Sequence, residues 1–191
     1  VQLAMNLPFH DHEWVMRKAV VAIYYCGGLR SIELRNLTYG SVSVDREGYW
    51  IRFQQAKARG PAESREFLVP WNREREDICF ASRVKTYMEM LNASLGSSIK
   101  EDDALFHRST SQGFSVQVVG EKSLANISKE VAKILGLKAP ETFTSHGHRR
   151  ASATEAADNG ATVYDMMRMY GWKVCLITSQ LHEILFLQFY A

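Results

Sequence analysis

The chain has 191 residues, of which 46% are hydrophobic, and its 23 Lys and Arg against 21 Asp and Glu give a formal net charge of +2. This length suits one globular domain, and the apolar content is enough for a hydrophobic core, so the composition argues against a disordered chain. The charge balance neither requires nor excludes a nucleic-acid partner, because a local basic patch can bind phosphate on a nearly neutral protein.

The cysteines and the lack of long apolar runs bear on whether this is a metal-binding, disulfide-linked or membrane protein. Cys26, Cys79 and Cys175 lie far apart and no CxxC motif is present, so we expect no metal site, no disulfide framework and no cofactor. Scattered cysteines fit a reducing compartment, either the nucleus or the cytoplasm. No signal peptide or membrane-length apolar run is present, so we expect no membrane partner. The chain begins at Val1, and we expect it to be a domain of a longer protein.

The first half of the chain changes from helical to strand periodicity. Apolar residues recur at helical spacing from Asp11, the expected N-cap, to Cys26, and Gly27 and Gly28 end this helix. Gly48 marks the turn between the first two strands, and the longer polar segment KARGPAES joins the second pair. In order, we expect a short helix over 31–37 and strands over 41–45, 49–54 and 65–70.

The second half of the chain is predicted to be helical. The irregular stretch 96–121, which contains GSS and SQG, is the longest interruption. We expect helices over 77–95, 122–136, 147–159, 162–170 and 174–189. The pattern predicts an α+β fold, mostly helical with a small three-stranded antiparallel sheet, in a single domain over 1–191.

Two segments place cations at the starts of helices. In GGLRSIEL (27–34), Arg30 begins a helix and Glu33, three residues on, shares its face. In HGHR (146–149), His146 and Arg149 are also three residues apart, so the imidazole and the guanidinium are expected to converge.

Two further groups complete a pattern that resembles a known family. Lys57 lies at the mouth of the hairpin 51–69, and Gly171-Trp172 follows the helix expected to end at residue 170. The sequences GLRSIEL, HGHR and GW, in this order and at these intervals, resemble the boxes of the tyrosine recombinases of the phage integrase family. The resemblance covers about residues 10–190. It implies the catalytic-domain fold of that family, without its separate N-terminal core-binding domain, and an origin in a mobile element.

The resemblance also implies roles for individual residues. Arg30 and Arg149 would clamp the nonbridging oxygens of a DNA phosphate, with Glu33 holding Arg30 in place. His146 and the Trp172 indole would donate further hydrogen bonds, and Lys57 would serve as the general acid. The implied partner is double-stranded DNA. Further contacts to its phosphates are expected from Arg59, Lys122, Arg150 and Lys173.

The nucleophile of the family is missing from its usual place. A tyrosine is expected near position 181, which is Leu181, and Tyr190 is the only tyrosine beyond Trp172. Three explanations remain open. The domain binds DNA without cleaving it, which we favour; or Tyr190 acts from a displaced helix, in cis or exchanged between copies of a homo-oligomer; or the segment beyond 173 is altered relative to a working parent.

Other classes of function remain as alternatives. These are a type IB topoisomerase relative, a non-enzymatic DNA-binding or chromatin protein, and a protein-interaction module. Individual residues also have structural interpretations: a surface ion pair for Arg30 and Glu33, a solvated cation for Lys57, and a core position for Trp172. We interpret His148 as structural and Tyr24, Tyr25, Tyr164 and Tyr170 as core residues.

Overall fold

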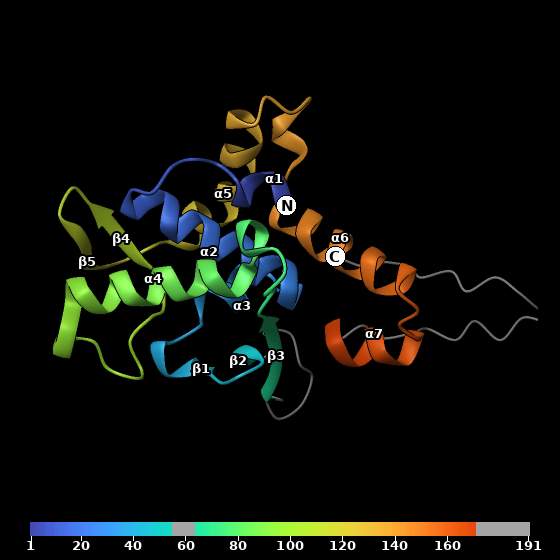
Figure 1. Ribbon diagram of the computed structural model, residues 1–191, viewed down its shortest axis with the longest axis horizontal. Coiled ribbons are helices and arrows are strands. Elements are labelled where there is room, and N and C mark those ends of the chain that lie inside the picture. Colours follow the sequence, from blue (N-terminus) through green and yellow to red (C-terminus); the bar gives the residue numbers. More distant parts are fainter. Residues whose placement is uncertain (55–63, 171–191) are drawn as a thin grey trace, which may run out of the picture.

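A computed structural model describes residues 1–54 and 64–170 of the chain (Figure 1). The helices are α1 (Gln2–Met5), α2 (His12–Gly27), α3 (Ser31–Arg35), α4 (Phe80–Leu95), α5 (Glu121–Ile134), α6 (Ser145–Asp158) and α7 (Val163–Tyr170). The strands are β1 (Val42–Val44), β2 (Gly48–Gln54), β3 (Ser64–Pro70), β4 (His107–Thr110) and β5 (Gly113–Val118). The mostly helical α+β class and the three-stranded antiparallel sheet are confirmed.

Helix α2 forms the centre of the core. Its N-cap is Asp11, whose carboxylate accepts a hydrogen bond from the Trp14 backbone N–H at 3.0 Å, as predicted. Its middle turns are buried on all sides and its neighbours are α4, α5, α6, β3 and β4. A helix that is apolar around its whole circumference is stable only inside a protein, so the other elements assemble around α2.

The sheet β1–β2–β3 packs against the C-terminal end of α2. Its strands are antiparallel, with Ile51 of β2 opposite Phe67 of β3. Alternate side chains of β2 are buried and exposed, which gives one apolar face. A Cβ atom on Gly27 would lie 2.4 Å from the Phe67 ring, so only glycine lets the sheet approach the helix this closely.

The prediction that the stretch 96–121 is irregular is wrong. This stretch contains the antiparallel hairpin β4–β5. Its strands are short, their register shifts between His107 and Ser109, and β4 reads as the polar sequence HRST, so the period-two signal is weak. The hairpin is held from α4, where the Tyr87 hydroxyl donates to the Leu105 carbonyl at 2.7 Å and accepts from the His107 N–H at 3.2 Å.

Other boundaries differ in smaller ways. The helix predicted over 77–95 is divided into a 3₁₀ turn (Glu76–Ile78) and α4, because Cys79 between them is extended, with φ −69° and ψ 114°. Helix α1 was not predicted. The helix predicted over 174–189 lies outside the described residues.

Helices α6 and α7 form the end of the described chain. Helix α6 packs on α2, and α7 packs on α6 through Ala153, Met166 and Tyr170 (Figure 1). In the ribbon view α7 and the β4–β5 hairpin lie at opposite ends of the molecule. Within residues 1–54 and 64–170, no helix is both long and apolar enough to cross a membrane.

Candidate active site

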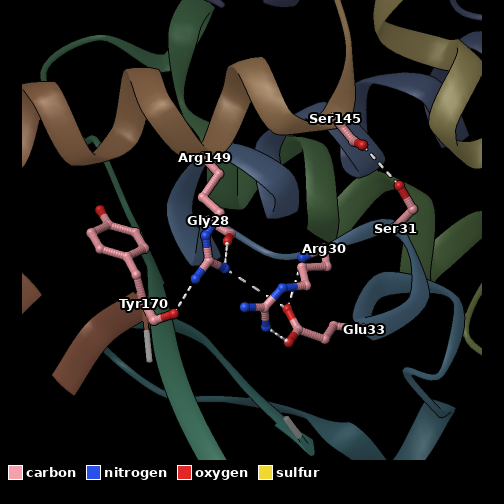
Figure 2. A network of polar contacts seen from close by, with 7 residues as sticks. All are labelled: Gly28, Arg30, Ser31, Glu33, Ser145, Arg149 and Tyr170. Atoms are coloured by element: carbon pink, nitrogen blue, oxygen red, sulfur yellow. Dashed lines mark hydrogen bonds and ion pairs between the residues drawn. The ribbon is translucent and has the colours of Figure 1, made fainter. Parts of the chain in front are cut away.

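Arg30 forms an ion pair with the buried carboxylate of Glu33 at the start of α3. Gly28, with φ +53°, caps α2, and Arg30 follows in an extended conformation as the N-cap of α3. The Arg30 backbone N–H and its Nη1 donate to the two Glu33 carboxylate oxygens, each at 2.7 Å (Figure 2). The Glu33 side chain is only 1% exposed, so this is not the surface ion pair of the alternative interpretation.

Arg149 reaches the same carboxylate from α6. Its Nη1 lies 4.0 Å from Glu33 Oε2 and donates to the Gly28 carbonyl at 2.7 Å, while its Nη2 donates to the Tyr170 carbonyl (Figure 2). Burial, and next the positive charge of Arg30, lower the pKa of Arg149 to about 10. One buried carboxylate therefore serves two guanidinium groups, so this trio has a net positive charge.

A hydroxyl pair joins the helices that carry the two arginines. Ser31 in the first turn of α3 and Ser145 in the first turn of α6 lie 2.8 Å apart, Oγ to Oγ (Figure 2). These residues are 114 positions apart in the sequence, and their hydrogen bond holds the N-terminal ends of α3 and α6 together.

His146, on the first turn of α6, lies beside the arginine cluster formed by Arg30, Arg149 and Glu33. Its side chain is largely exposed. Its pKa is lowered, first by partial burial and then by the charges of Arg150, Arg149 and Arg30. A neutral imidazole is therefore favoured at neutral pH, and this form has one donor and one acceptor nitrogen.

His148 points away from this cluster, as expected. Its Nε2 lies 2.7 Å from Ser128 Oγ, and its ring stacks on the Tyr24 ring at a centroid distance of 5.7 Å. Burial lowers the pKa of His148 to about 4, so the ring is neutral and packs between α2 and α5.

Tyr170 closes the cluster on the side of α7. It is 3% exposed, and its hydroxyl oxygen lies 2.7 Å from Ser152 Oγ. Core positions are confirmed for Tyr170 and Tyr24, whereas Tyr25 is half-buried. The core position predicted for Tyr164 is wrong, because this side chain is 72% exposed. On a two-turn helix only one face meets α6, and that face carries Met166 and Tyr170, which are four residues apart.

The chain resembles known proteins in both its sequence and its fold. A model of the phage integrase family matches residues 4–182. The chain belongs to this family. Together, the family match and the fold identify a tyrosine recombinase catalytic domain. No curated protein matches the sequence.

Solved structures of recombinases share the fold. The XerH site-specific recombinase bound to difH substrate, in a pre-cleavage complex, aligns with a TM-score of 0.64 and 15% identity, over 90% of this chain and 44% of that one. The post-cleavage complex of XerH on a palindromic difH substrate aligns with a TM-score of 0.64 and 15% identity, over 89% of this chain and 43% of that one. The XerA recombinase aligns with a TM-score of 0.58 and 20% identity, over 82% of this chain and 49% of that one. This chain therefore spans less than half the length of the recombinases that it matches.

The site of this integrase-family domain is only partly covered by the described residues. Arg30, Glu33 and Arg149 come together as predicted, with His146 beside them. Lys122 on α5 and Arg150 on α6 are both exposed. The other predicted site residues lie outside the described residues: Lys57, Arg59, Trp172, Lys173 and Tyr190, together with Leu181.

Two further residues at this site belong to none of the predicted motifs. Arg65 on β3 lies close enough for its charge to lower the pKa of Arg149. Arg65 could have been found from its position, because it begins the strand predicted to follow the hairpin segment that carries Lys57. Tyr170 was assigned only to the core, although its carbonyl binds Arg149. In the described part of the chain, no cluster of His, Cys, Asp and Glu could hold a metal ion.

Proposed function

We propose that this domain binds double-stranded DNA and holds one phosphodiester at Arg30, Arg149 and His146, as part of a site-specific recombinase. The observation that carries the proposal is the single buried carboxylate of Glu33 shared by two guanidinium groups. A phosphate would place a second negative charge opposite these two guanidinium groups. Hydrogen bonds between charged partners contribute about 1.5–3 kcal/mol each, and planar guanidinium groups suit the oxygens of a phosphate.

Exposed cations on α5 and α6 support a DNA partner. Lys122, Lys129 and Lys133 lie at positions i, i+7 and i+11 of α5 and therefore share one face. Lys122 and Lys133 are exposed and Lys129 is half-buried, while the opposite face of the helix packs on the core. Such a row of lysines matches a DNA backbone, which presents phosphates at regular intervals. XerH, which shares the fold, was solved on its difH DNA substrate.

We further propose that strand cleavage is impaired. Leu181 occupies the position where the family resemblance places the tyrosine nucleophile, and a leucine side chain cannot attack phosphorus. The two arginines and His146 would then bind a phosphate without transferring it. We propose that the domain derives from a mobile element and acts in the nucleus or cytoplasm. The alternative is cleavage by Tyr190, delivered within one chain or through the C-terminal segment of a second copy.

DNA binding is tested by titrating a labelled duplex with the protein at several salt concentrations. Replacing Arg149 or Arg30 by Ala should weaken binding and reduce the slope of log K against log salt by about one. Arg75→Ala is the matched control, because Arg75 is an exposed arginine whose guanidinium pairs with Asp77. Equal effects of Arg149→Ala and Arg75→Ala would argue against a phosphate site. Absence of salt-dependent binding in the parent would favour a protein-interaction module.

Cleavage is tested separately with a nicked suicide duplex and a denaturing gel. We expect no covalent protein–DNA adduct. An adduct that persists in Tyr190→Phe would point to another nucleophile. An adduct that disappears in Tyr190→Phe would show a working recombinase, and mixing inactive Arg149→Ala with Tyr190→Phe would then reveal whether the tyrosine is donated between copies.

A further inference from the structure

Tyr170 contacts the arginine cluster through three of its parts. It is the last residue of α7, it is 3% exposed, and its ring, hydroxyl and carbonyl each meet a different group. Its ring lies against Gly28 and its hydroxyl lies beside Ser152 of α6. Its carbonyl accepts from Arg149 (Figure 2). What distinguishes Tyr170 from other buried tyrosines such as Tyr87 is that its carbonyl accepts from a site arginine.

The ring packs on the backbone of Gly28, two residues before Arg30. A Cβ atom on Gly28 would lie 2.4 Å from the Tyr170 ring, so the absence of a side chain at this position makes the contact possible. The Arg149 guanidinium carbon lies 5.8 Å from the ring centroid, within the range of a cation–π contact. The ring therefore covers one side of Arg149, whose side chain is 7% exposed.

The hydroxyl and the carbonyl of Tyr170 act on the same helix. Ser152, which is 8% exposed, lies three residues after Arg149 and so on the same face of α6. The hydrogen bond between the Ser152 and Tyr170 hydroxyls, 2.7 Å long, fixes the end of α7 on α6. The Tyr170 carbonyl is thereby placed at Arg149 Nη2, while the Gly28 carbonyl accepts from Nη1 at 2.7 Å.

We infer that Tyr170 is a positioning residue for Arg149. Its hydrogen bond to Ser152 places its carbonyl so that, with the Gly28 carbonyl, it orients the guanidinium toward Glu33 and Arg30. An arginine with two nitrogens held by backbone carbonyls loses little rotational freedom when a phosphate binds, so affinity is gained through preorganisation. What Arg149 is positioned for rests on the proposed function. That it is positioned by Tyr170 does not.

The first test needs no DNA. Arginine labelled with ¹⁵N allows the exchange of the Arg149 Nε proton with water to be measured, and Arg149→Lys assigns the signal. Tyr170→Phe and Ser152→Ala each remove one side of the hydroxyl pair. We expect each to raise the exchange rate about two- to tenfold, which corresponds to one buried hydrogen bond. Both variants lose the same interaction. The exchange rate in the double variant should therefore be close to that in either single variant, rather than higher by a second step of about two- to tenfold.

A matched control separates positioning from a general loss of stability. Tyr87→Phe also removes a buried tyrosine hydroxyl, one that donates to the Leu105 carbonyl in a different part of the core. It should lower the melting temperature without changing the exchange of the Arg149 proton. An unchanged exchange rate in Tyr170→Phe, or an equal rise in Tyr87→Phe, would overturn the inference.

A second measurement links positioning to the ligand. In the salt-dependent titration, Tyr170→Phe should weaken duplex binding about two- to tenfold, and this effect should disappear in an Arg149→Ala background. If Tyr170→Phe weakens binding equally with and without Arg149, the inference is wrong. If the parent protein does not bind DNA but the Nε exchange changes as expected, the positioning role stands and the proposed function fails.

Discussion

Replacing Glu33 by Gln tests whether a single buried carboxylate holds the site together. The side chain of Glu33 is 1% exposed, and those of its partners Arg30 and Arg149 are 27% and 7% exposed. Gln keeps the size of the side chain but removes its charge, so two cations lose their shared counterion. Breaking a buried ion pair costs about 3–5 kcal/mol, and the remaining amide oxygen recovers about 1 kcal/mol as an acceptor.

The expected net loss is therefore about 2–4 kcal/mol in the free energy of unfolding. For a domain of this size it corresponds to a fall in melting temperature of roughly 4–16 °C. Urea unfolding followed by circular dichroism measures the loss. Glu89→Gln is the matched control, because Glu89 pairs with Lys85 at 3.8 Å on the surface, with the two side chains 64% and 55% exposed. We expect a loss below about 0.5 kcal/mol for this control. A loss in Glu33→Gln as small as that in the control would refute the shared counterion.

Three further predictions address the surroundings of the site. Gly28→Ala should destabilise the domain by more than Gly136→Ala, since both glycines follow the end of a helix with positive φ (53° and 64°) but only a Cβ on Gly28 would meet the Tyr170 ring; urea unfolding of both variants separates the clash from the cost of a positive φ. Because the pKa of His148 is lowered to about 4 in the folded state, the unfolded chain binds more protons as the pH falls from about 6.5 to about 4, and stability should fall over this window by about 2–3 kcal/mol. His148→Gln should abolish this part of the pH dependence of unfolding, and an unchanged pH profile would show that His148 is not its source. Lys129→Ala should reduce the salt slope of duplex binding by about one while leaving the Arg149 proton exchange unchanged; an unchanged slope would remove α5 from the DNA interface.

The parts of the site that follow helical spacing could be predicted from the sequence. Arg30 and Glu33 lie three residues apart at a helix start and pair as expected, because residues at this spacing share a helix face. The same spacing predicts that His146 lies near Arg149, and the charge of Arg149 does lower the pKa of His146. The burial of Glu33 could not be predicted in this way, since it depends on α6 bringing Arg149 from a distant part of the sequence.

The main-chain contacts of the site have no sequence signature. The two carbonyls that bind Arg149 belong to Gly28 and Tyr170, and every residue has a carbonyl, so only the folded arrangement reveals which ones are used. The β4–β5 hairpin escaped prediction for a related reason. Its strands are short and half-exposed, and their position is set by contacts with α4 rather than by a repeating apolar pattern.

The two glycines at the end of α2 have a mechanical consequence. The Phe67 ring of β3 packs on Gly27 and the Tyr170 ring of α7 packs on Gly28, so two aromatic rings from different elements contact adjacent residues. β3 follows the segment 55–63 in the chain, and α7 precedes the segment 171–191. A side chain at either glycine would push the corresponding ring, and with it β3 or α7, away from the end of α2. Two adjacent glycines thus set how closely the hairpin strand and α7 both approach the helix that carries the site.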